Sequence, residues 1–336
     1  MHSQPNGYAQ SVHDTALTEQ LIAYLKDAHS IEGQALRQMR AAPRIAGEPG
    51  LSAAFQEHLA ETEGHERLMR ECLERHGASP SLVKEALMRA GGEAFVLFAR
   101  SQPDTPGKLA AHTFSYEHLE AGAYELLRRL AERAGDDATA GAAREILVQE
   151  RAMAARIEAL FTRAVDASLG DLAGAELERR LVRYLADAHA IERQSETLLV
   201  KGRAIAGTGA LAQALEDHLP QTYRHAAVIA DRLRAHDSSP SLIKDAAMRL
   251  GALNWGSFFA AQPDTPPKLA AFAYAFEHLE IGGLQELRLV AQRAEDPETV
   301  GVVEEILADE SEAAASIAQT FDAALDATLR AEGVAA

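Results

Sequence analysis

The feature that most constrains the fold of this 336-residue chain is an internal repeat with a period of 160 residues. Shifted by that period, the chain lies on itself without a gap. SPSLVKEALMRAGG (79–92) meets SPSLIKDAAMRLGA (239–252), and YEHLE (116–120) meets FEHLE (276–280). The period is far longer than a solenoid unit, so the repeat indicates a duplicated domain.

Each copy has the pattern of an all-α domain, because Ala, Leu, Glu and Arg dominate and no alternating β-branched run occurs. In the first copy we expect long helices at 15–42, 52–76, 105–134 and 138–166, with short helical turns between 80 and 101. Four long helices per copy predict two tandem ferritin-like four-helix bundles, each with an extra short segment between its second and third helices. We place these domains at 14–168 and 174–330, after a disordered segment at 1–13.

Each long helix of the first copy carries at least one carboxylate on the stripe that would face the bundle axis. On the third helix, Glu120 shares its stripe with Tyr116 and Tyr124. Burying an ionised carboxylate costs several kcal/mol, and clustered carboxylates also repel one another. A pair of metal ions neutralises such a cluster most directly, and four-helix bundles are known to hold metal pairs with Glu and Glu-x-x-His motifs.

The candidate metal ligands recur in both copies. They are Glu32, Glu61, His65, Glu117, Glu120 and Glu150 in the first copy and Glu192, His225, Glu277, Glu280 and Glu310 in the second. His58, His218 and Gln221 are candidates for a supporting role behind the ligands, although the spacing leaves open which histidine of the second helix binds metal. Because Gln221 replaces Glu61 with an uncharged amide, we expect the second site to be weak or empty.

The order and spacing of these motifs resemble the YciE/YciF-type ferritin-like stress proteins over roughly 20–165 and 180–325. The matching residues are Asp27 and Glu32, His58 to Thr62, Glu117 to Glu120, and Glu150. The resemblance implies ferritin-like bundles, a dimetal and most simply di-iron carboxylate centre, and homodimers. It carries over five glutamates as ligands: Glu32, Glu61, Glu117, Glu120 and Glu150. Two copies in one chain suggest a pseudo-dimer, with further homo-oligomers as an extension.

We therefore expect two iron ions per site, or manganese in their place, reacting with oxygen or peroxide. The function would be of the ferroxidase or peroxide-detoxifying type in a stress response, and a di-iron oxidoreductase is the enzyme class concerned. The alternative is a non-catalytic helical stress or scaffold protein with degenerate metal sites, especially in the second domain. The two hypotheses differ in whether the chain contains stoichiometric metal.

Charge and composition exclude other partners. The net charge of −17 argues against nucleic acid and anionic membranes, because both need basic patches. No apolar run approaches the 18 residues of a membrane span, and the polar first residues lack the apolar region of a signal peptide. A single cysteine, Cys72, allows no intrachain disulfide, so we expect a cytoplasmic protein.

Overall fold

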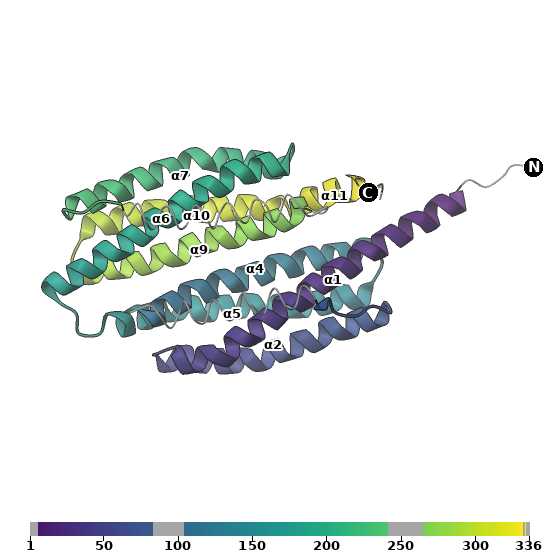
Figure 1. Cartoon of the computed structure of the whole chain (residues 1–336), viewed down its shortest axis with the longest axis horizontal. Helices are drawn as coiled ribbons and strands as arrows, with labels where there is room; N and C mark the ends of the chain where they lie inside the picture. Colours follow the sequence, from purple (N-terminus) through teal and green to yellow (C-terminus); the bar gives the residue numbers. More distant parts are fainter. Residues whose placement is uncertain (1–5, 83–103, 241–264, 332, 334–336) are drawn as a thin grey trace, which may run out of the picture.

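The structure is a computed structural model that describes residues 6–82, 104–240, 265–331 and 333. Within these residues the chain is almost entirely helical and has no β-strand, which confirms the all-α, tandem-bundle fold (Figure 1). None of the helices in this part combines the length and the hydropathy that crossing a bilayer requires. The short helical segments expected between the second and third helices of each copy lie mostly outside the described residues.

The N-terminal half has one helix for each long helix expected from the sequence. It consists of α1 (Asn6–Ile45), α2 (Pro49–Arg75), α4 (Thr105–Arg133) and α5 (Asp137–Leu169). The start of α1 differs from expectation, since the helix begins at Asn6 inside the segment 1–13 for which disorder was predicted. Gly135, with a φ of +67°, turns the chain from α4 into α5, and the Asp136 carboxylate caps α5 by accepting from Thr139 N at 3.0 Å.

The C-terminal half repeats this arrangement with one change. It consists of α6 (Gly174–Ala206), α7 (Ala210–Ala235), α9 (Thr265–Arg293), α10 (Pro297–Gln319) and α11 (Phe321–Ala331). The fourth long helix is thus divided at Thr320, whose hydroxyl donates to the carbonyl oxygen of Ile317 at 2.7 Å. Such a local side-chain bond to the backbone competes with the helical ladder. The corresponding stretch of α5 is continuous.

Two apolar clusters fill the N-terminal bundle and leave a layer between them. On α1, Leu21 and Leu25 belong to one cluster and Met39 to the other, and on α4 Leu127 and Leu109 are divided in the same way. The residues between these positions, on every helix of the half, include the predicted carboxylates. The two flanking clusters therefore hold the helices in place on both sides of a polar layer. Their burial stabilises the fold by roughly 25 cal/mol per Å² of apolar surface removed from water.

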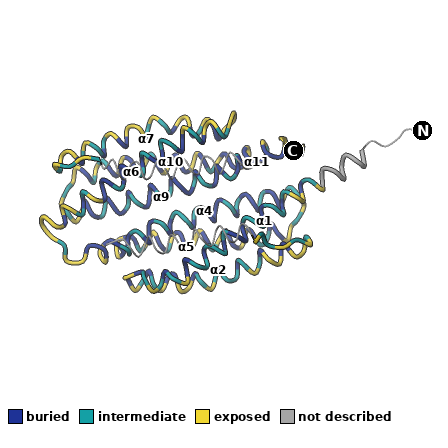
Figure 2. Tube along the Cα trace, in the orientation of Figure 1, coloured by how far each residue is buried: buried dark blue, intermediate teal, exposed yellow. Residues whose placement is uncertain are grey.

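The two halves pack against each other through α4 and α9, which lie side by side in the middle of the molecule (Figure 1). Both helices are largely buried along their length, whereas α2 and α7 show exposed outer faces (Figure 2). The contacts come in pairs related by the 160-residue shift: Gly122 faces Ala271, and Gly282 faces Ala111. Equivalent residues exchanging contacts in this way are the pattern of a two-fold dimer, here within one chain.

Histidines lie on the approximate two-fold axis of this contact. The rings of His118 and His278 stack with centroids 3.5 Å apart, and each Nδ1 donates to a backbone carbonyl of its own helix at 2.7 Å. Burial lowers the pKa of His118 to about 4 and that of His278 to about 3. Both rings are therefore neutral at pH 7, so they can stack without charge repulsion.

Candidate metal centres

The polar layer of the N-terminal half brings six side chains from four helices together. These are Glu32 from α1, His58 and His65 from α2, Glu117 and Glu120 from α4, and Glu150 from α5, hereafter the N-terminal centre. All are buried, with at most 2% of each residue exposed. On α2 the histidines are seven residues apart, two helical turns, so both rings project from one face into the layer.

The ligand atoms of this centre form two groups that share one glutamate. Glu32, His65 and Glu150 make one group, and His58, Glu117, Glu120 and Glu150 make the other; within each group the atoms lie within 4.8 Å of one another. His58 Nε2 lies 3.2 Å from Glu117 Oε2 and 3.4 Å from Glu150 Oε2. His65 Nδ1 lies 2.8 Å from Glu150 Oε1 and 3.6 Å from Glu32 Oε1. Glu150 thus faces both histidines, one through each oxygen.

Most inward atoms of the N-terminal centre lack a hydrogen-bond partner among the described residues. They are His58 Nε2, His65 Nδ1, Glu32 Oε2 and both oxygens of Glu117, Glu120 and Glu150. The close approaches between these nitrogens and oxygens do not have hydrogen-bond alignment. Buried polar groups in native proteins are otherwise almost always satisfied, so this concentration in one layer calls for a ligand or protons.

The outward ring nitrogens of the same histidines are satisfied. His58 Nδ1 lies 2.8 Å from Glu61 Oε2, and His65 Nε2 lies 2.8 Å from Gln149 Oε1. An ionised carboxylate and an amide oxygen only accept, so each outward nitrogen carries the proton and donates it. In the neutral ring the inward nitrogen then has its lone pair free, which is the tautomer that a metal-binding histidine needs.

The C-terminal half builds the same layer. Its members are Glu192 from α6, His218 and His225 from α7, Glu277 and Glu280 from α9, and Glu310 from α10, hereafter the C-terminal centre. His218 Nε2 lies 3.3 Å from Glu277 Oε2 and 3.1 Å from Glu310 Oε2. His225 Nδ1 lies 2.7 Å from Glu310 Oε1 and 3.7 Å from Glu192 Oε2. Again one glutamate, Glu310, belongs to both groups.

The pKa shifts of the buried groups show that the layer favours positive charge and bound protons. Burial alone would lower the pKa of His58, but Glu117, Glu61 and Glu150 outweigh it and raise the pKa to about 11. Burial, reinforced by the neighbouring carboxylates, raises the pKa of Glu120 well above its usual range. Without a cation the layer therefore holds protons on its histidines and on part of its carboxyl groups.

The structure brings together most of the residues that the sequence singled out. In the N-terminal centre, five of the six predicted ligands meet, and Glu61 does not. Its carboxylate lies outside the layer, against His58 Nδ1 and the guanidinium of Arg156 at 2.9 Å. His58, expected in a supporting role, occupies the inward position instead.

In the C-terminal half, too, a histidine that was expected behind the ligands lies in the inward position. His218 points inward, and Gln221 stands behind it, with its Oε1 2.9 Å from His218 Nδ1. Glu280 lies in the layer but outside the two groups, and its Oε2 accepts a hydrogen bond from Ser195 Oγ at 3.2 Å.

Sequence reasoning missed several residues that contact the centres. Gln149 and Asp309 hold the outward nitrogens of His65 and His225, at 2.8 and 3.0 Å. Tyr124 donates a hydrogen bond to Glu32 within the N-terminal centre. The sequence did contain a signal for Gln149 and Asp309. Both are polar, they align at the 160-residue shift, and each directly precedes a predicted ligand, Glu150 or Glu310.

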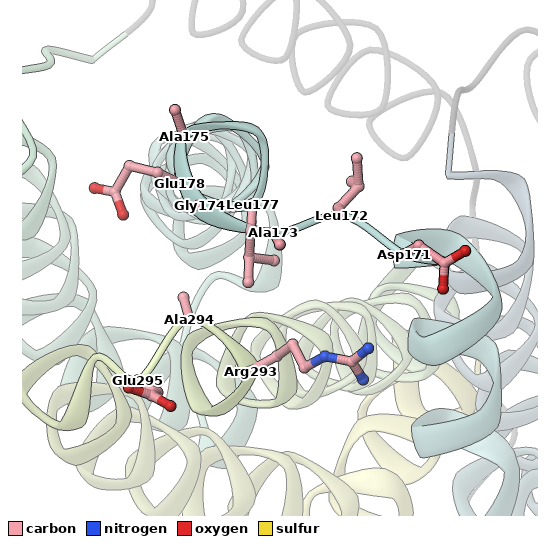
Figure 3. A pocket seen from close by; sticks show the side chains of 10 residues that line it. All are labelled: Asp171, Leu172, Ala173, Gly174, Ala175, Leu177, Glu178, Arg293, Ala294 and Glu295. Carbon is pink, nitrogen blue, oxygen red and sulfur yellow. The ribbon is translucent and has the colours of Figure 1, made fainter.

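A surface pocket lies apart from these layers, where the linker between the halves meets the end of α9 (Figure 3). Asp171, Glu178, Arg293 and Glu295 are among its lining residues, and Arg293 donates to Asp166 at 3.1 Å. None of the lining residues belongs to either centre, so the pocket adds nothing to their chemistry.

Fold and site together define a tandem pair of helical bundles, each with a buried carboxylate and histidine layer in which metal ions could be held. The chain belongs to the family described as a domain of unknown function, DUF892, whose model matches residues 16–170 and 176–330. Two successive matches establish the tandem duplication of that domain. No solved structure matches the chain.

Proposed function

We propose that each centre holds a pair of metal ions, most simply iron, and that the protein is a dimetal carboxylate protein. One observation carries this proposal: inward nitrogen and oxygen atoms without hydrogen-bond partners, on buried residues of four helices, fall into two groups that share one glutamate. Four carboxylates per centre, when ionised, match the charge of two divalent cations. Carboxylate and imidazole donors suit iron and manganese.

The proposed ligands differ in one respect from those that the sequence favoured. In the N-terminal centre, Glu32, His65 and Glu150 would hold one ion, while His58, Glu117, Glu120 and Glu150 would hold the other. Glu61 would orient His58 and keep its proton on the outward nitrogen. In the C-terminal centre, Glu192, His225 and Glu310 would hold one ion, and His218, Glu277 and Glu310 the other. Glu280 would contribute its charge from beside them.

Iron bound in such a layer supplies redox chemistry toward oxygen or peroxide, and we propose an iron-oxidising or peroxide-removing reaction. The resemblance to the YciE/YciF-type stress proteins supports that choice. This chain's own part is to bind the ions and to exclude water with the apolar clusters on both sides. The protons displaced from the histidines and from Glu120 would leave when metal binds.

A second candidate function is a metal-free helical scaffold, and one observation favours it. Each layer already contains two histidines next to carboxylates, and the carboxylates around His218 raise its pKa to about 12 although burial opposes them. Two imidazolium ions with two protonated carboxyl groups would leave a layer of four glutamates neutral. In that case the buried ion pairs would serve the fold alone.

Metal content decides between the two candidates. Protein purified without chelator and reconstituted anaerobically with ferrous iron would be analysed for metal per chain, then exposed to oxygen while absorbance is followed. Glu117→Ala and Glu277→Ala each remove a ligand from one centre, and Glu145→Ala, exposed on α5, is the matched control. About four irons per chain and an oxygen-dependent absorbance change support the dimetal function. No stoichiometric metal of any kind would leave the scaffold.

A further inference from the structure

The outward nitrogens of the four histidines are held by two different kinds of acceptor. In the N-terminal half the carboxylate of Glu61 is behind His58, and the amide of Gln149 is behind His65. In the C-terminal half the amide of Gln221 is behind His218. A carboxylate stands behind the other histidine of that half, the one corresponding to His65. Each centre therefore keeps one carboxylate and one amide, in exchanged places.

The carboxylate in question is Asp309, which accepts from His225 Nε2 at 3.0 Å. In each half, an arginine contacts the carboxylate that stands behind a histidine, and this arginine also occupies a different position in the two halves. Arg156 donates to Glu61 at 2.9 and 3.1 Å, whereas Arg224 donates to Asp309. Ser316 stands in the C-terminal half at the position that aligns with Arg156.

Four aligned positions differ together between the halves, and the differences compensate. They are Glu61 and Gln221, Gln149 and Asp309, Arg156 and Ser316, and Gly64 and Arg224. A centre that was merely decaying would lose the charge at Glu61 without gaining one elsewhere. Here the complete arginine, carboxylate and histidine unit is present in both halves, on different histidines.

The nature of the outward acceptor affects the inward nitrogen. A carboxylate that accepts the outward N–H makes the imidazole a stronger donor to a metal than a neutral amide does. Loss of such a partner typically lowers metal affinity by about 10- to 100-fold. The two metal positions within one centre are therefore unequal, since only one of their histidines contacts a carboxylate directly. In the C-terminal half Asp309 reaches His218 only through Gln221, whose Nε2 donates to Asp309 Oδ1 at 3.5 Å.

We propose that the two positions of each centre bind metal with unequal affinity and that the order is reversed between the halves. The tighter position contains His58 in the N-terminal centre and His225 in the C-terminal centre. Glu61 and Asp309 are the positioning residues that set this order. The inference rests on the proposed metal binding, and it assigns the C-terminal centre a working role instead of the weak one that Gln221 alone suggested.

The test is a zinc titration of the metal-free full chain, because Zn²⁺ is diamagnetic and binds imidazole and carboxylate. Histidine labelled with ¹⁵N reports by NMR which ring nitrogens bind, and His58→Gln and His225→Gln assign the two key signals. The first two equivalents are expected to shift His58 and His225, and the next two His65 and His218. Competition with a chelator gives the affinities.

Variants separate the proposal from a general structural effect. Glu61→Gln is expected to weaken the His58 position by about 10- to 100-fold, and Asp309→Asn to do the same at His225. Glu57→Gln is the matched control, since Glu57 contacts the same Arg156 at 3.2 Å and, among the described residues, forms no ion pair with a histidine. The double variant Glu61→Gln with Gln149→Asp is expected to move the first zinc of the N-terminal centre to His65.

Each outcome is decisive. If zinc binds but corresponding histidines of the two halves fill in the same order, or all four fill together, the reversed order is wrong. The same conclusion follows if Glu61→Gln behaves like Glu57→Gln. If no histidine signal shifts at any zinc concentration, the proposed metal binding itself fails, and the order becomes irrelevant.

Discussion

The two halves of this chain share their inner layer and differ in the residues behind it. The four glutamates and two histidines of each centre coincide at the 160-residue shift, whereas Glu61 and Gln149 become Gln221 and Asp309. The amount of outer charge stays the same while its place changes. The comparison teaches that a single lost carboxylate in a duplicated domain says little until the packing shows which residue has replaced it.

A second difference between the halves lies at their interface. Glu286 on α9 is fully buried, and neither of its oxygens has a hydrogen-bond partner among the described residues. The aligned residue on α4 is Leu126, which is also buried. A Cβ added at Gly107 would lie 2.9 Å from Glu286 Oε1, so the glycine leaves the room that this carboxyl group occupies. The two-fold relation of the halves is thus broken by charge at this point.

The largest expected effect comes from removing the shared glutamate of one centre. Because Glu150 belongs to both ligand groups, Glu150→Ala is expected to abolish both metal positions of the N-terminal centre and to leave the C-terminal centre intact. Glu310→Ala should do the reverse. The metal content, measured by elemental analysis, should then fall from about four ions per chain to about two in either variant. Unequal losses of metal in the two variants would show that the inner layers are not equivalent. The control Glu145→Ala should leave the metal content unchanged.

The next effect is the pH dependence of the metal-free protein. The pKa of His218 is raised to about 12 and that of Glu277 to about 8, both above their unfolded values of 6.5 and 4.5. Their stabilisation is complete below the unfolded values and is lost as pH rises through the folded ones. Between pH 5 and 9 we expect the melting temperature of the metal-free protein to fall by roughly 5–10 °C.

Bound metal should reverse this trend, because it replaces the protons and binds more tightly as pH rises. Differential scanning calorimetry with and without Mn²⁺ measures both slopes. Glu120→Gln and Glu280→Gln should reduce the metal-free slope by similar amounts if the inner layers are equivalent. A melting temperature of the metal-free protein that is independent of pH over this range would contradict the prediction.

The sequence allowed the fold to be predicted well. The helix pattern and the turn residues concern local order, and the repeat is visible when the sequence is compared with itself. It placed the carboxylates of the two layers on the inward stripes for the same reason, but it also counted Glu61, which lies outside the layer. It could not decide between His58 and His65, because both lie on the inward face of α2. Nor could it find the role of Asp309, which depends on α10 packing against α7 and on a contact between residues 84 positions apart.

The interface gives the third prediction. Burial raises the pKa of Glu286 to about 8, although Lys108 opposes the shift, so ionisation of this carboxyl group costs stability, and the cost grows as pH rises above the unfolded value of 4.5. Glu286→Leu should stabilise it by about 1–4 kcal/mol, since apolar replacement of buried ionic groups is often favourable. Lys108 keeps Asp187 at 3.1 Å as its partner. The mirror change, Leu126→Glu, should destabilise by about 3–5 kcal/mol.

Urea unfolding of the metal-free protein measures both changes, and Glu286→Gln separates the charge from the shape of the side chain. If Glu286→Leu is destabilising, the buried carboxyl group contributes to the interface and the halves differ there for a structural reason. If Leu126→Glu is tolerated, the interface has room on both sides, and the packing at Gly107 does not explain the difference.

The smallest expected effect concerns the arginines that hold the outer carboxylates. Glu61 is about one third exposed, so without Arg156 its carboxylate can turn toward water and away from His58. Arg156→Ala should lower zinc affinity in the N-terminal centre by about 2- to 5-fold, in keeping with the small energies of exposed ion pairs. Arg224→Ala should act only in the C-terminal centre and more weakly, because Arg224 is the more exposed of the two. Arg144→Ala, on α5 but paired with Glu132, is the control. An equal loss in all three variants would reflect net charge alone and would remove the arginines from the explanation of how the halves differ.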